Sequence, residues 1–250
     1  MSSAKRIQSL VRNVQFCFKL LTNQATITLL IVNDMTRMAQ NFIDKLLHHA
    51  DTALRTLCPP QQRVCSRPLP NEGIVNAAPL TDREKQHVAG LMRVNHAGEV
   101  CAQALYQGQA MTARLTEVRQ QMEQAAAEEV DHLAWCERRL LELNSRPSVL
   151  NPLWYLGSLC IGALAGLAGD KWSLGFVAET ERQVGAHLRD HLDNLPAADL
   201  KTKAILQQMH EEESHHAAMA EAAGAAALPS PIQAMMSTVS KLMTKTSYYL

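Results

Sequence analysis

Two segments of the chain place a glutamate three residues before a histidine, as Glu129-x-x-His132 and Glu213-x-x-His216. Residues three apart lie on the same face of a helix, so each pair can present a carboxylate and an imidazole together. The face of the first pair is otherwise apolar, carries no lysine or arginine, and continues through Met122, Ala125, Cys136 and Leu140. Burying a carboxylate without a partner costs several kcal/mol, so this pattern predicts a bound cation.

The second segment, Glu-Glu-Glu-Ser-His-His, contains two overlapping pairs, and the flanking residues discriminate between them. Glu213 and His216 share a helix face with Leu206, Met209 and Ala220. The alternative pair, Glu212 and His215, shares its face with Ile205, Gln208 and Met219. The first face is the more apolar, which predicts Glu213 and His216 as the ligands. Glu212 and His215 would then face solvent or support the ligands.

Each pair is preceded in the sequence by a segment with a lone candidate glutamate. Glu99 shares a face with Met92, Ala102 and Tyr106. Glu181 shares a face with Val177, Val184 and Leu188, and it is preferred over the neighbouring Glu179. Gly98 is expected to let another helix approach closely, at some cost in helix propensity. Three further histidines are expected to support the ligands or lie on the surface: His96, His187 and His191.

These assignments give four carboxylates and two imidazoles: Glu99, Glu129, His132, Glu181, Glu213 and His216. One glutamate from each of two helices, plus Glu-x-x-His from each of two others, is the ligand pattern of ferritin-like di-metal carboxylate proteins. Mixed oxygen and nitrogen ligands suit iron or manganese and argue against a thiolate site. Two cations about 3.5–4 Å apart need bridging anions, and the glutamate of each Glu-x-x-His pair is the natural choice. No catalytic residue beyond these ligands is predicted.

The helices that must position these residues can be delimited in the sequence. Apolar periodicity predicts helices at about 82–113, 117–143, 171–195 and 196–224, the last with Pro196 at its first position. The first begins with a capping box, Thr81-Asp-Arg-Glu84, and a further helix is predicted at 230–250. A lone glutamate followed by Glu-x-x-His occurs twice, so two similar hairpins would form a pseudo-symmetric, all-α four-helix bundle.

The composition agrees with a helical protein and excludes several other classes. Hydrophobic residues make up 47% of the 250 residues, whereas aromatic residues, which favour strands, make up only 4%. The formal net charge of zero provides no field that would attract nucleic acid. The six cysteines are scattered without a Cys-x-x-Cys pair, which disfavours zinc ribbons and secreted disulfide frameworks.

Three parts of the chain differ in composition. Residues 1–40 are interpreted as a leader, non-native or disordered, and the first 33 are basic and contain no acid. A true start at Met35 or Met38 is preferred over an organelle-targeting segment. Residues 41–80 comprise an amphipathic helix and a linker with five prolines, and residues 81–250 are expected to form the di-metal bundle domain.

Four segments carry a resemblance to a known family: RVNHAGEV at 93–100, EEVDHL at 128–133, FVAETERQVGAHL at 176–188 and HEEESHHA at 210–217. In these motifs the chain resembles the demethoxyubiquinone hydroxylases, ferritin-like di-iron monooxygenases of ubiquinone biosynthesis. The similarity covers about 82–250, with a weaker match at 41–57, and finds no counterpart for 1–38. It implies the same six ligands, two Fe²⁺ ions, and O2 as co-substrate for hydroxylation of the quinone ring of demethoxyubiquinol. Electrons would come from an external reductant, because the sequence contains no G-x-G-x-x-G dinucleotide motif.

The uncharged run at 153–169 is short for a membrane span and is expected to lie on or slightly into a membrane. Such a helix suits a substrate with an isoprenoid tail, and Trp154, Tyr155 and Trp172 are expected near the interface. The alternative is a helix buried in the bundle. The resemblance implies the cytoplasmic face of a bacterial cell membrane, or the mitochondrial inner membrane in a eukaryote, with other ubiquinone-biosynthesis proteins as candidate partners.

Two rival functions would use the same helices. A ferritin-like ferroxidase or iron-handling protein also needs a di-iron bundle, but its soluble cage needs no lipid affinity, and the apolar run argues against it. A helical scaffold without chemistry would bury six polar groups for no gain.

Overall fold

The computed structural model describes residues 43–44, 47–58, 63 and 65–250, so the predicted leader at 1–40 lies outside the described residues. The chain divides into two units after Thr52, and the second, Ala53–Leu250, contains helices α2 to α7. The described residues form helices and no strand, which confirms the predicted all-α class. The helices are α2 (Asp82–Thr112), α3 (Thr116–Glu142), α4 (Asn151–Ala168), α5 (Asp170–Asn194), α6 (Leu200–Ala222) and α7 (Ser230–Tyr249).

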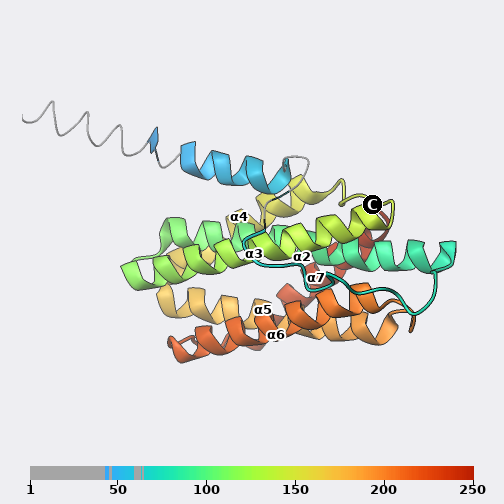
Figure 1. Ribbon diagram of the computed structural model, residues 1–250. Helices are drawn as coiled ribbons and strands as arrows, with labels where there is room; N and C mark the ends of the chain where they lie inside the picture. The colour runs from blue at the N-terminus through green and yellow to red at the C-terminus, as the bar shows by residue number, and fades with distance from the viewer. Residues whose placement is uncertain (1–42, 45–46, 59–62, 64) are drawn as a thin grey trace, which may run out of the picture. The chain divides into compact units, whose positions relative to one another are not determined.

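Four long helices, α2, α3, α5 and α6, run side by side as two hairpins, and Figure 1 shows the α2–α3 pair above the α5–α6 pair. Helices α4 and α7 pack chiefly against α2. One apolar cluster includes Met92, Cys136, Leu188 and Met209. A second includes Tyr106, Met122, Val177 and Ala220. The predicted ligands lie between these two clusters along each of the four helices, so apolar side chains close both ends of the site.

The starts of α2 and α6 show how capping residues set the helix boundaries. The amide of Glu84 donates to Thr81 Oγ1 at 3.3 Å, and the amide of Thr81 donates to Glu84 Oε2 at 2.8 Å, which confirms the capping box. The predicted start of α6 at Pro196 is wrong. The helix begins at Leu200 because the Asp199 carboxylate accepts from the amide of Thr202 at 3.1 Å and caps it.

Close helix approach occurs between α2 and α4 rather than at the predicted glycine. A Cβ atom on Gly108 would overlap the carbonyl oxygen of Leu159, and one on Gly162 would overlap that of Leu105. Among the described residues, no atom beyond its own helix lies within 4 Å of the Cβ position of Gly98, so the expectation of close approach there is wrong. The chain thus places a close α2–α4 contact about two and a half turns along α2 from Glu99.

Helix α4 exposes much of its apolar surface. It is long and apolar enough to cross a membrane by length and composition, and only 28% of it is buried. Four of its leucines are exposed: Leu153, Leu156, Leu164 and Leu167. Tyr155, expected at a membrane interface, instead points inward and donates its hydroxyl to Gln107 Oε1, so that prediction is wrong. Trp172 is 43% exposed, and the indole of Trp154 donates to Ser247 Oγ at 3.1 Å.

Candidate metal centre

The structure brings all six predicted ligands together in the middle of the bundle. Two groups of side chains each have ligand atoms within 4.8 Å of one another, and every member is buried. The first group is Glu99, Glu129, His132 and Glu213, and the second is Glu181, Glu213 and His216. Glu213 belongs to both groups, so the two form one continuous cluster.

The two imidazoles face the same pair of carboxylates. Nδ1 of His132 lies 2.8 Å from Glu129 Oε2 and 3.0 Å from Glu213 Oε1. Nδ1 of His216 lies 3.4 Å from the other oxygen of each glutamate, Glu129 Oε1 and Glu213 Oε2. Each of these carboxylates therefore has one oxygen toward each histidine. That is the arrangement expected of carboxylates that bridge two cations.

Burial and mutual charge shift the pKa values of the cluster in opposite directions. Burial raises the pKa of Glu99 and of Glu181 well above the usual range. Burial also raises the pKa of Glu129, but the charge of His132 and the hydrogen bonds from His132 and His216 together outweigh it and hold that pKa below the usual range. Burial lowers the pKa of His216, but the Glu129 and Glu213 carboxylates outweigh this and raise it to about 12. The raised pKa values of Glu99, Glu181 and His216 favour bound protons, which offset part of the negative charge of the cluster. Bound metal cations can offset the same charge.

The residues present fit a two-metal centre, because several of their ligand atoms have no hydrogen-bond partner. Among the described residues, five buried atoms of the cluster have no hydrogen-bond partner: Glu129 Oε1, Glu181 Oε2, Glu213 Oε1, Glu213 Oε2 and His216 Nδ1. In folded proteins in general, most buried polar atoms are paired, since an unpaired one costs about 1–3 kcal/mol. The donor set of carboxylate oxygens and imidazole nitrogens suits iron or manganese.

The alternative ligands lie outside the two groups. Glu212 Oε2 lies 2.7 Å from Nε2 of His132, on the side of the ring away from Nδ1. Glu179 instead pairs with Arg182 and accepts from Gln183, both at 2.8 Å. His215 is exposed. Choosing the more apolar helix face therefore predicted Glu213, His216 and Glu181, which are the residues that the structure brings together.

Tyr106 is a site residue to which the sequence analysis gave no role. Its hydroxyl donates to Glu181 Oε1, and burial raises the pKa of its phenol well above the usual value, which keeps it a donor. With Met122 and Met219 it also lines a cavity of about 40 Å³ that reaches His216. Its seven-residue spacing from Glu99, two helical turns, was the available signal.

The three other histidines bond away from the cluster. His96 contacts Glu137 Oε1 at 3.2 Å and Asn151 Nδ2 at 3.1 Å. His191 Nδ1 lies 2.8 Å from Asn95 Oδ1, and burial lowers the pKa of this histidine to about 4. His187 Nε2 lies 2.9 Å from Ser240 Oγ. None of the three belongs to either ligand group.

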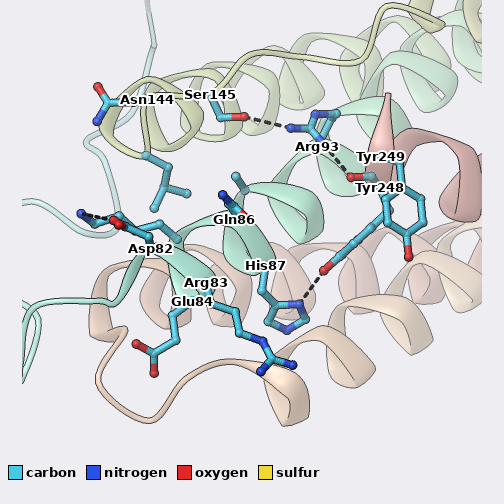
Figure 2. Close-up of a pocket in the computed structure, with 13 residues that line it drawn as sticks. Asp82, Arg83, Glu84, Gln86, His87, Arg93, Asn144, Ser145, Tyr248 and Tyr249 are labelled. Atoms are coloured by element: carbon cyan, nitrogen blue, oxygen red, sulfur yellow. Dashed lines mark hydrogen bonds and ion pairs between the residues drawn. The ribbon is translucent and has the colours of Figure 1, made fainter.

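A larger cavity, of about 1000 Å³, lies by the first turns of α2 and the end of α7 and contains none of the six residues. Figure 2 shows that polar groups in its wall bond to one another. His87 Nδ1 lies 2.7 Å from the hydroxyl of Tyr248, and Arg93 donates to the Tyr248 carbonyl at 2.5 Å and to Ser145 Oγ at 2.9 Å. These contacts tie the chain's C-terminal end to α2.

A four-helix bundle with four glutamates and two histidines at its centre defines the class of ferritin-like di-metal carboxylate proteins. The sequence model of the family described as "Ubiquinone biosynthesis protein COQ7" matches residues 86–247, and the chain belongs to this family. It is 63% identical over 210 residues to the 3-demethoxyubiquinol 3-hydroxylase of Legionella pneumophila (strain Corby), covering 84% of this chain and 98% of that one. It is 59% identical over 208 residues to the enzyme of that name from Acinetobacter baylyi, covering 83% and 97%.

Proposed function

We propose that this chain is a 3-demethoxyubiquinol 3-hydroxylase, a monooxygenase that hydroxylates the quinone ring of demethoxyubiquinol with O2 in ubiquinone biosynthesis. The observation that carries this proposal is the buried cluster of four glutamates and two histidines in a member of this family. Relatives that this chain matches over nearly their whole length bear the name of this activity, whereas no observation favours the ferroxidase alternative.

The proposed cofactor is a pair of Fe²⁺ ions held by Glu99, Glu129, His132, Glu181, Glu213 and His216. Bound ferrous iron supplies the activation of O2 that hydroxylation of a ring carbon requires. The reductant is proposed to be external, because the sequence contains no G-x-G-x-x-G segment.

The chain's own residues exclude water and hold the ligands in place. Glu129 and His132 are fully buried, and Glu213 is 1% exposed, so bulk water does not reach the centre of the cluster. A buried site of low dielectric strengthens the attraction between carboxylates and cations. The Tyr106 hydroxyl fixes one oxygen of Glu181 and leaves the other free to bind an ion.

The membrane is the proposed source of the substrate, whose isoprenoid tail is apolar. Helix α4 would lie on the lipid surface through Leu153, Leu156, Leu164 and Leu167, all about 60% exposed or more. The bacterial relatives favour the cytoplasmic face of a bacterial cell membrane as the location. Other ubiquinone-biosynthesis proteins would meet the enzyme there.

The function can be tested by quinone analysis in a bacterium that lacks its own demethoxyubiquinol hydroxylase. The wild-type chain should restore ubiquinone and clear the accumulated demethoxyubiquinone, whereas Glu129→Ala should not, because it removes a carboxylate that faces both histidines. Unchanged demethoxyubiquinone with the wild-type chain, expressed and loaded with iron, would contradict the proposal.

A further inference from the structure

Arg67 lies in the segment that precedes α2, and its side chain contacts two helices of the bundle beside the metal centre. The guanidinium donates from Nε to Asp131 Oδ2 of α3 at 2.7 Å and from Nη1 to Glu212 Oε1 of α6 at 2.6 Å. The same group lies over the ring of Trp135, 4.9 Å from its centroid. One side chain from outside the four helices therefore joins α3 to α6 beside the proposed ligands.

The backbone that carries Arg67 is itself tied to α3. Ser66 donates from its amide and from its hydroxyl to the two oxygens of Asp131, both at 2.7 Å. Arg63 forms an ion pair with Glu137, six residues beyond Asp131 on α3, at 2.9 Å. These contacts leave the guanidinium of Arg67 little freedom to move away from Glu212.

Glu212 connects Arg67 to the ligand His132. One of its oxygens accepts from Arg67 and from Gln208 Nε2 at 2.6 Å, and the other lies 2.7 Å from Nε2 of His132. A carboxylate held by donors in this way is a fixed acceptor for the Nε2 proton of the imidazole. The tautomer with its proton on Nε2 has its lone pair on Nδ1, the nitrogen that faces Glu129 and Glu213.

We propose that Arg67 is a positioning residue of the metal centre, which holds Glu212 against Nε2 of His132 and so aims Nδ1 at the bound ion. The inference rests on the proposed metal site and adds a residue from outside the bundle to it. Groups that orient a histidine ligand commonly change metal affinity about 10- to 100-fold when they are removed.

The other histidine also has a carboxylate beside Nε2, but no arginine holds that carboxylate in the described part of the chain. Nε2 of His216 lies 2.7 Å from Glu128 Oε2, and the other oxygen of Glu128 accepts from Gln124 Nε2 at 3.1 Å. The Glu128 side chain is 41% exposed and forms no ion pair there with a lysine or arginine. Arg67 is therefore expected to affect one of the two ions, the one bound by His132.

The test compares Arg67→Met with Arg63→Met in the full chain. Both variants remove one arginine from the same segment, but only the first loses a contact to Glu212. The methionine can still pack against Trp135. Metal-free protein is titrated with Co²⁺, and the visible absorption of the bound ion reports affinity and ligand geometry independently of activity. Thermal melts of the metal-free variants measure any general loss of structure.

Wild-type protein should bind two Co²⁺ ions per chain. Arg67→Met should weaken one of them about 10- to 100-fold and change its absorption spectrum, Arg63→Met should titrate as wild type, and Arg67→Lys should recover part of the loss. If Arg67→Met binds both Co²⁺ ions as tightly as the wild type, or if both methionine variants lose the same Co²⁺ affinity, the proposed role of Arg67 is overturned and the metal site still stands. Fewer than two ions in the wild type would instead count against the metal site itself.

Discussion

Glu212 and Glu213 are adjacent in the sequence, yet their carboxylates contact opposite nitrogens of the His132 ring. Glu213 Oε1 lies 3.0 Å from Nδ1, and Glu212 Oε2 lies 2.7 Å from Nε2. Consecutive residues of a helix are about 100° apart around its axis, so two neighbours can reach the two sides of one imidazole. Glu213 is placed to be a ligand and Glu212 to orient one.

Exchanging each of these glutamates for alanine should separate the two roles. Glu213→Ala removes a carboxylate shared by both ligand groups, so the protein should bind less than one iron per chain. Glu212→Ala should still bind two ions, with an affinity for one of them about 10- to 100-fold lower. Iron content after anaerobic purification measures both. Loss of metal from Glu212→Ala alone would contradict the assignment of Glu213.

The hydrogen bond from the Tyr106 hydroxyl to Glu181 should contribute to the stability of the protein. Tyr106→Phe leaves the buried Glu181 Oε1 without its donor, which should lower the free energy of unfolding of the metal-free protein by about 1–3 kcal/mol. With metal bound the loss should be smaller, because a cation can compensate the carboxylate charge. Urea unfolding of both forms measures the difference. A larger loss in the metal-loaded form would show that Glu181 does not bind the ion.

The sequence predicted the cluster well because metal binding constrains both residue type and spacing. Glu213 and His216 could be chosen over their neighbours since a buried carboxylate must lie on an apolar face, and apolarity is visible along a single helix. Arg67 could not be predicted in the same way. It lies in a proline-rich segment without periodicity, and its partners Asp131 and Glu212 are more than 60 residues away.

Other errors have related causes. The expected close approach at Gly98 depended on which helix lies opposite, and the pattern of one helix does not contain that information. Tyr155 was assigned to an interface by its position in an apolar run, but its side chain faces Gln107 of α2. The start of α6 was assigned by Pro196, whereas the stronger local signal was the capping carboxylate of Asp199.

The α2–α4 contact gives a paired prediction with glycine-to-alanine changes. Gly108→Ala should destabilise the protein, by about 1–3 kcal/mol, because the added methyl group overlaps the Leu159 carbonyl and forces the helices apart. The added methyl group of Gly98→Ala meets no neighbouring atom in the part of the chain that the structure describes, so this change should stabilise the protein by about 0.5–1 kcal/mol through higher helix propensity. Thermal unfolding of both variants measures the effects. Destabilisation by Gly98→Ala would mean that a partner packs on this position.

The exposed leucines of α4 give a prediction about lipid binding that does not depend on activity. Leu156 and Leu164 are 60% and 66% exposed, and burial of a leucine side chain in lipid contributes about 1.5–3 kcal/mol. Leu156→Glu and Leu164→Glu should each weaken binding to vesicles of phosphatidylethanolamine and phosphatidylglycerol about tenfold or more. Co-sedimentation with the vesicles measures the bound fraction.

The matched control for these variants is Leu141→Glu, the same change at a leucine of α3 that is 65% exposed. If α4 lies on the lipid surface, this variant should sediment with the vesicles as the wild type does, since the added charge is similar and only its position differs. Equal weakening by all three variants would indicate a general effect of negative charge near anionic lipid. Wild-type protein that stays in the supernatant would show that the leucines of α4 do not bind this membrane, and the quinol tail would then have to reach the cluster by another route.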